Sequence, residues 1–287
     1  MRKYLVVKKN KTKLFIIIFI LIIFTNSALG NSLITTIFIP EGIVMASDSR
    51  ECIFINGVIT SIFSDTATKL FLSKKHKIGI SSWGIGALND ISITNHIRNF
   101  IGKELTNDDD IITVTNKLFE YFKNISVSNE NIYFHVAGYK KENKVSVPYV
   151  YFLNIKDNLI KRMNIDSDNK IDYGITCGGE TDILYSIFKP VKITDEKGNE
   201  KTIKEVDPFL WEAMTLQDAI DFSIYAIRTT IDTMRSQDGP QTVGGPIDVL
   251  LISPEEAKFI QNKELQGELI KIGINPRYYK RESLNND

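Results

Sequence analysis

Two short apolar segments joined by a turn constrain the fold of this chain more than any other feature. Residues 33–39 read Leu-Ile-Thr-Thr-Ile-Phe-Ile, and residues 43–46 read Ile-Val-Met-Ala. Pro40-Glu41-Gly42 separates them. Runs rich in β-branched residues and bounded by Pro and Gly predict strands, and the short turn makes the two strands antiparallel neighbours. We therefore expect this strand pair to start the folded part of the protein.

The rest of the sequence divides into blocks of strands and blocks of helices. Asn56-Gly57 is the strongest hairpin signal and should join strands at 53–55 and 58–59. Segregated blocks of this kind favour an α+β fold. Further strands are expected at 78–82, 131–139, 147–153, 159–163, 173–179 and 247–252, and helices at 90–105, 110–125, 180–188, from Thr215 to about 236, and 255–269. Residues 191–207 are charged and are expected to form a surface loop or insertion.

The strand at 247–252 and the helix that precedes it indicate how the layers are arranged. The strand is nearly all apolar, which is typical of a strand buried on both faces. Thr215 and Asp218 resemble a capping box, and apolar residues then recur at helical spacing. Two sheets sandwiched between helical layers would cover such strands.

The first 30 residues have the pattern of a signal peptide. A basic segment precedes the apolar run at 14–24, and Ala28-Leu29-Gly30 places small residues at the −3 and −1 positions of a cleavage site. The sequence thus predicts export with cleavage after Gly30, leaving one domain over 31–275 and a polar tail over 276–287. The alternative is a membrane anchor at 14–24.

Charge and composition restrict the partners and cofactors. The full chain has 35 basic and 35 acidic residues, but residues 1–30 carry six basic residues and no acid, so cleavage takes the net charge from 0 to −6. A mildly acidic protein is not expected to bind nucleic acid. The three histidines lack ligand spacing, so neither a metal nor another cofactor is expected. Cys52 and Cys177 are either two buried thiols or, in an oxidising compartment, a disulfide.

Four residues occur in an order that suits nucleophilic catalysis: Ser32, Asp48, Lys69 and Gly84. A hydroxyl needs a base within hydrogen-bond reach, and an N-terminal residue can supply its own α-amine. A neighbouring lysine lowers the pKa of that amine by like-charge repulsion, and an aspartate can orient the lysine. The backbone N–H of a glycine turn can hold the developing oxyanion. Ser32 would then be the nucleophile, with Lys69 tuning its amine, Asp48 orienting Lys69 and Gly84 donating to the oxyanion.

The motifs around these residues resemble those of proteasome β-type subunits, which are N-terminal-nucleophile hydrolases. Asp48 lies in Ala46-Ser47-Asp48-Ser49-Arg50, Lys69 begins Lys69-Leu70-Phe71, and Gly84 follows Ser82-Trp83. In the family the acid lies 16 residues after the nucleophile, which places the nucleophile at Ser32. The chain would be an exported bacterial or archaeal-type relative, similar to the family over about residues 32–260.

The resemblance carries implications for fold, substrate and assembly. It implies the four-layer αββα sandwich of these hydrolases over residues 31–275, a peptide or small amide as substrate, and a possible homo-oligomer. Lys69 comes about five residues late, which implies an extended hairpin around Asn56-Gly57. The membrane would be a partner only if residues 14–24 are retained.

Several departures from the family pattern keep other interpretations open. The nucleophile position is Ser where active proteasome subunits use Thr, and cleavage after Gly30 would leave Asn31 in front of Ser32. Pro240 and Val243 occupy the spacing of a late Asp and Ser that support the amine. Thr35 is an alternative nucleophile, and an inactive fold acting as an assembly or binding module is another.

A purely structural interpretation of Asp48 and Arg50 is also open. The two residues could form an ion pair at a strand end.

Overall fold

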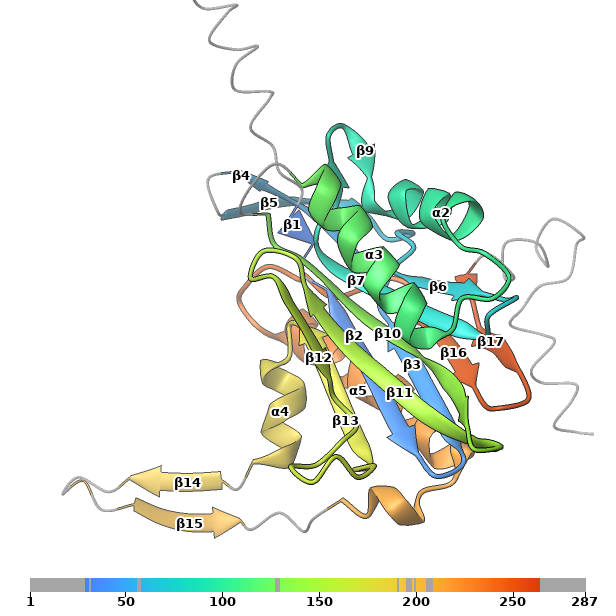
Figure 1. Cartoon of the computed structure of the whole chain (residues 1–287). Coiled ribbons are helices and arrows are strands. Elements are labelled where there is room, and N and C mark those ends of the chain that lie inside the picture. The colour runs from blue at the N-terminus through green and yellow to red at the C-terminus, as the bar shows by residue number, and fades with distance from the viewer. Residues whose placement is uncertain are drawn as a thin grey trace, which may run out of the picture.

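The computed structural model describes residues 29–30, 32–55, 58–126, 130–189, 191–194, 198, 200–204 and 209–263. Two antiparallel sheets of six and five strands form its centre, with helices outside them (Figure 1). The expected α+β class is confirmed. The segments expected to be a signal peptide or anchor and a polar tail, 1–28 and 276–287, lie outside the described residues.

The five-stranded sheet is built on the strand pair predicted at residues 33–39 and 43–46. Its order is β13-β2-β3-β16-β17. Every residue of β2 and β3 is buried, as expected for strands covered on both faces. The strands are β2 (Leu33–Ile39), β3 (Gly42–Ser47), β13 (Gly174–Gly179), β16 (Asp248–Ile252) and β17 (Ala257–Gln261).

The six-stranded sheet brings the middle of the chain beside its beginning. β7 pairs with β10 along one edge, and β6 and β1 follow one another along its other edge. The residues before β2 therefore lie on the same edge of β7 as the residues that begin β6. The strands are β1 (Leu29–Gly30), β6 (Leu70–Ser73), β7 (Ile78–Ile85), β10 (Ile132–Glu142), β11 (Val145–Asn154) and β12 (Leu159–Arg162).

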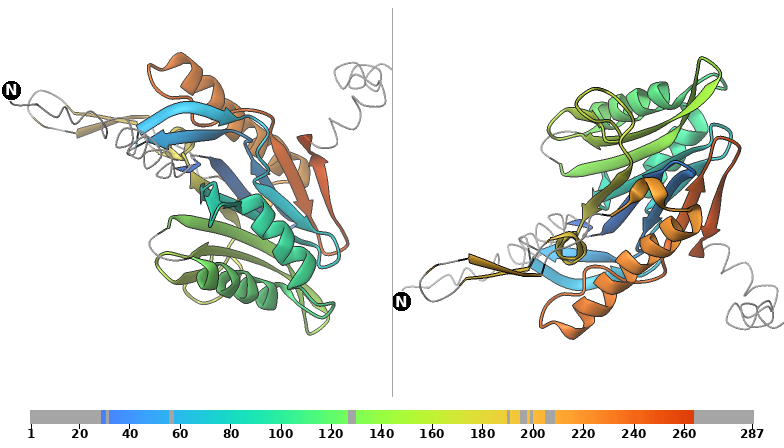
Figure 2. Two further views of the ribbon diagram at one scale, coloured as in Figure 1. Left: turned by 90° about the horizontal axis from the view of Figure 1, so that it is seen from above. Right: turned by 90° about the horizontal axis from the view of Figure 1, so that it is seen from below.

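Three apolar clusters hold the layers together. Helices α2 (Ile93–Lys103) and α3 (Ile111–Ile125) pack on the outer face of the six-stranded sheet. Helices α4 (Asp182–Phe188) and α5 (Leu216–Ser236) pack on the outer face of the other sheet. The third cluster lies between the two sheets. Figure 2 shows the ribbon from above and from below.

Short-range signals fix the ends of the helices. The Thr215 side chain accepts a hydrogen bond from the Asp218 amide, and the Asp218 carboxylate accepts one from the Thr215 amide, so the predicted capping box is present. Asp110 caps α3 by accepting a hydrogen bond from the Thr113 amide. These bonds satisfy N–H groups that have no partner inside the helix.

One expected element was wrong, and the expected surface insertion at 191–207 has a regular structure. Residues 191–207 contain a hairpin, β14 (Val191–Thr194) and β15 (Glu200–Lys204), which extends away from the body (Figure 1). Within the expected helix at 255–269, residues 257–261 instead form β17, whose backbone pairs with the free edge of β16; residues 264–269 lie outside the described residues. β16 and β17 form a hairpin across residues 253–256, and side chains along β17 are alternately partly buried and exposed, as in a strand with one covered face.

The remaining elements are small. The predicted hairpin at Asn56-Gly57 is present as β4 (Glu51–Ile55) and β5 (Val58–Ser64), and it holds the extra residues before Lys69. Two short strands and a 3₁₀ turn complete the described part: β8 (Ala87–Leu88), β9 (Ile91–Ser92) and η1 (Trp211–Ala213). Among the described residues, no helix has the length and apolar character needed to cross a membrane.

Candidate active site

A fully buried carboxylate, that of Asp48, organises the candidate site. It follows the end of β3 and accepts four hydrogen bonds. Its Oδ1 accepts from Lys69 Nζ at 2.8 Å and from the Leu33 amide at 3.0 Å. Its Oδ2 accepts from the Arg50 amide at 3.1 Å and the Gly244 amide at 3.0 Å. Since both oxygens are fully engaged, the carboxylate is held in one orientation.

Lys69 is held at the same point by its backbone and by its side chain. Its Nζ also donates to the Arg50 carbonyl at 2.6 Å, and only 6% of its side chain is exposed. Its own carbonyl accepts from the Ser82 amide at 2.9 Å, which ties it to β7 two residues before Gly84. The Lys69 side chain is thus buried and held in a fixed position directly before β6.

Ser32 immediately precedes Leu33, whose amide shares the Asp48 Oδ1 atom with Lys69. It is 1% exposed, and its carbonyl accepts from the Glu180 amide at 2.7 Å. Ser32 therefore lies at the start of β2, one residue from the Asp48–Lys69 pair.

Gly84 lies near the end of β7, where the N-terminal segment pairs with this strand. Its φ is +108°, and a Cβ there would lie 1.9 Å from the Asn131 carbonyl oxygen, so a side chain does not fit. Gly30 is its partner in the pairing of β1 with β7. The chain two residues before Ser32 consequently lies directly beside Gly84. The structure brings all four sequence-predicted residues into one region.

Thr35 lies in a different setting from Ser32. It is in the interior of β2, fully buried, and is paired with Ala46 on one side and Cys177 on the other. Freeing its amine would require removal of the first residues of a central strand. Ser32, at the beginning of the strand, requires no such loss.

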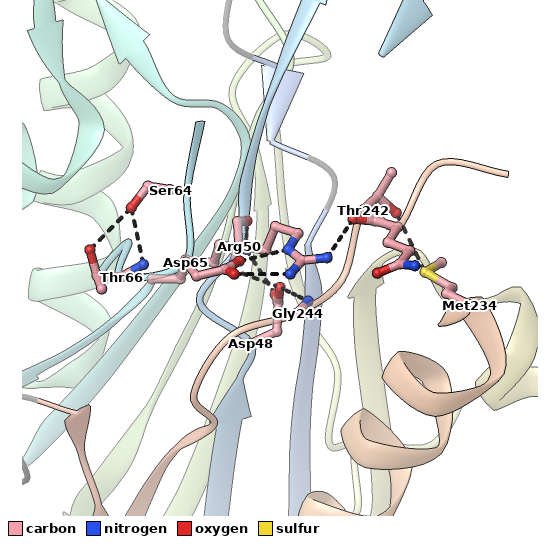
Figure 3. Close-up of polar contacts among 10 residues, drawn as sticks. Asp48, Arg50, Ser64, Asp65, Thr66, Met234, Thr242 and Gly244 are labelled. Atoms are coloured by element: carbon pink, nitrogen blue, oxygen red, sulfur yellow. Dashed lines mark hydrogen bonds and ion pairs between the residues drawn. The ribbon is translucent and has the colours of Figure 1, made fainter. Parts of the chain in front are cut away.

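The ion pair between Arg50 and Asp65 supports the Asp48–Lys69 pair. Arg50 donates to both carboxylate oxygens of Asp65, at 2.6 and 2.9 Å, and to the Gln241 carbonyl at 3.0 Å (Figure 3). Its guanidinium lies against Gly244, where an added Cβ would be 2.4 Å from Arg50 Cζ. The hydrogen bond from Arg50 holds the pKa of Asp65 below its usual range. The alternative of an ion pair between Asp48 and Arg50 was therefore wrong, because the Asp48 side chain pairs with Lys69 and the Arg50 side chain pairs with Asp65.

Sequence reasoning missed three contributors to this region: Asp65, Gly244 and Glu51. Nothing local in the sequence indicated the partners of Asp65 and Gly244. Glu51 begins β4, directly after Arg50. Burial raises the pKa of its carboxyl group, and the positive charge of Lys69 partly offsets that rise.

The cysteines are two free thiols, which decides between the two interpretations that the sequence left open. Burial raises the pKa of both, to about 12 for Cys177. Neither therefore has the thiolate character of a reactive cysteine. Across the part of the chain that the structure describes, no three His, Cys, Asp or Glu side chains gather as metal ligands would.

The fold is α+β and is similar to that of a proteasome-like protein. The structure of a Gly-1 mutant of Anbu from Hyphomicrobium sp. strain MC1 matches this chain with a TM-score of 0.51. The match covers 89% of this chain and 97% of that chain, at 14% sequence identity. At this identity the likeness shows the fold alone.

No protein-family model and no curated protein matches the sequence. The assignment of this chain to the proteasome β-type subunits, as an exported bacterial or archaeal-type relative, was therefore wrong: what the comparisons support is a distant similarity of fold.

Proposed function

We propose that this protein is an amide-bond hydrolase, a peptidase or amidase, whose nucleophile is the Ser32 hydroxyl once the chain in front of it has been removed. The observation that carries the proposal is the buried Asp48–Lys69 pair, to which the Leu33 amide is joined at a shared oxygen. A fixed ammonium beside the first residue of a strand is what an N-terminal nucleophile requires.

The proposed reaction uses the α-amine of Ser32 as general base. The amine accepts the hydroxyl proton while Oγ attacks the substrate carbonyl, and the Gly84 amide donates to the oxyanion. The amine then gives its proton to the leaving nitrogen, the C–N bond breaks, and an acyl ester remains on Ser32. Water, deprotonated by the same amine, hydrolyses the ester. The positive charge of Lys69 lowers the pKa of the amine, which keeps it neutral and able to accept a proton.

The arrangement of the layers supports the proposal. Helices, sheet, sheet and helices follow one another, which is the order of the αββα sandwich that we propose for this chain. Ser32 is preferred over Thr35 because it lies at the beginning of β2. Export with cleavage after Gly30 would remove the β1 residues from beside Gly84 and leave Asn31 to be removed by self-cleavage or by a second peptidase.

The test uses protein released from a cleavable fusion so that Ser32 is its first residue. We expect hydrolysis of peptide amides and covalent labelling of Ser32 by a hydroxyl-directed electrophile, read by mass spectrometry. Ser32→Ala and Lys69→Ala should abolish both, whereas Lys75→Ala, at an exposed lysine, should change neither. Circular dichroism checks that each variant is folded. Unchanged activity in folded Ser32→Ala protein would refute the proposal.

A non-catalytic binding or assembly module is the second candidate. It is favoured by one observation: β1 pairs with the edge of β7 at Gly84 and so occupies the place of the proposed oxyanion. If the mature protein keeps these residues, and the protein that starts at Ser32 is neither labelled nor active, this candidate replaces the first.

A further inference from the structure

Three aromatic side chains form a continuous surface next to the candidate site. Trp83, Tyr133 and Phe152 come from the neighbouring strands β7, β10 and β11. Their ring centroids are 5.6 Å apart for Trp83 and Tyr133, 6.0 Å for Trp83 and Phe152, and 6.2 Å for Tyr133 and Phe152. The rings are inclined to one another by only 13–29°. We call these three residues the aromatic wall.

The aromatic wall lies on the face of the six-stranded sheet that is turned toward the other sheet. Side chains alternate along a strand, so Trp83 shares a face with Gly79. A Cβ at Gly79 would meet Met45 and Leu250, which belong to the five-stranded sheet. Trp83 itself touches β13, since a Cβ at Gly178 would lie 2.3 Å from its ring.

The same contact places the wall beside Ser32. Gly178 is followed by Gly179, where an added Cβ would lie 1.7 Å from the Ser32 carbonyl oxygen. Trp83 also immediately precedes Gly84. The indole therefore packs on β13 one residue from the glycine that lies against Ser32, and it belongs to the residue that precedes Gly84. The packing of the rest of the chain does not fully cover the wall, because all three side chains remain partly exposed.

We infer that the aromatic wall binds an aromatic side chain of the substrate, adjacent to the amide that is cleaved, so that the preferred substrates are amides of aromatic amino acids. This rests on the proposed function. Stacked or offset aromatic pairs at such centroid distances are favourable beyond the apolar area that they bury. The partly exposed rings would be covered on binding, which adds the hydrophobic term.

Binding is measured without turnover, in protein that starts at residue 32 and carries Ser32→Ala and Trp211→Phe. Trp83 is then its only tryptophan, since the chain has two. N-acetylphenylalaninamide should change the Trp83 emission in a saturable way and bind at least about tenfold more tightly than N-acetylalaninamide. Equal binding of the two amides, or no change in emission, would overturn the inference. This experiment leaves the aromatic wall unmutated, so its result does not depend on whether a wall variant folds.

Variants separate this inference from the proposed function. Trp83→Ala should reduce the ratio of kcat/KM for phenylalanine amides over alanine amides at least about tenfold. Trp211→Ala is the matched control: it also removes a partly exposed tryptophan that contacts other rings, but on the outer side beside α5, and should leave the ratio unchanged. Aromatic binding by a protein without hydrolase activity would refute the proposed function alone. Hydrolysis with no preference for aromatic amides would refute the wall alone.

Discussion

His135 provides a quantitative test of the packing between the two sheets. Its ring is fully buried, with Nδ1 at 3.0 Å from the Thr36 hydroxyl and Nε2 at 3.3 Å from the Thr176 hydroxyl. The histidine is on β10 and both threonines are on the opposite sheet, so this network joins the sheets. Burial lowers the pKa of His135 from 6.5 to about 3. The imidazole is therefore neutral in the folded protein, and each ring nitrogen has a hydroxyl partner.

The sign of the pH effect follows from proton counting. Between pH 6.5 and 3 the unfolded chain binds a proton at His135 and the folded protein does not. Stability therefore falls as the pH falls through this window. With these two pKa values, the loss on going from pH 7 to pH 5 is about 2 kcal/mol, and it approaches about 1.4 kcal/mol for each further pH unit.

The assay is urea unfolding of the wild-type protein and of His135→Gln at several pH values. Gln keeps a hydrogen-bonding side chain but does not titrate, so the other groups cancel in the difference between the two proteins. We expect the stability advantage of the wild type to shrink by about 2 kcal/mol between pH 7 and pH 5. An advantage that stays constant within about 0.5 kcal/mol would refute the assignment of a neutral, buried His135.

Five further substitutions, measured by chemical denaturation, test the site, its supports and the cap of α5. Asp48→Asn should lower the free energy of unfolding by about 3–5 kcal/mol, because it leaves a buried ammonium without its counter-charge. Asp65→Asn, at a half-exposed carboxylate, should lower it by about 1 kcal/mol or less. Equal losses in the two variants would contradict this reasoning. Gly244→Ala should destabilise the protein, because its Cβ would overlap the arginine that packs there, whereas Gly239→Ala has open space and should be neutral. Thr215→Ala should cost about 1 kcal/mol through loss of the α5 cap, and no loss would contradict the capping box.

The sequence predicted those parts of the fold that local patterns determine. The hairpin of β2 and β3, the hairpin at Asn56-Gly57 and the capped helix α5 all have signals within a few residues. β17 and the β14–β15 hairpin were missed because periodicity over short, charged segments does not distinguish a strand from a helix or loop. Both pairings are hairpins between consecutive strands, so the sequence analysis missed the type of element and not a distant contact.

The candidate site shows the same division. Asp48 and Lys69 were found because each is embedded in a short motif, and the structure joins them at 2.8 Å. The hydrogen bond from the Gly244 amide to Asp48 joins residues that are 196 positions apart in the sequence. Its donor is a backbone group, so no pattern of side chains predicts it. The pairing of Arg50 with Asp65 was likewise hidden, because a charged residue has many possible partners in a sequence.

The most direct test of the central claim is the mass and N-terminal sequence of the mature protein recovered from its producing cells. The proposed mechanism requires a free α-amine on the nucleophile, so we predict a protein that begins at Ser32. A mature protein that begins at Asn31 or further upstream would leave the Ser32 hydroxyl without its base and contradict the mechanism. A protein that begins at Thr35 would contradict the choice of Ser32.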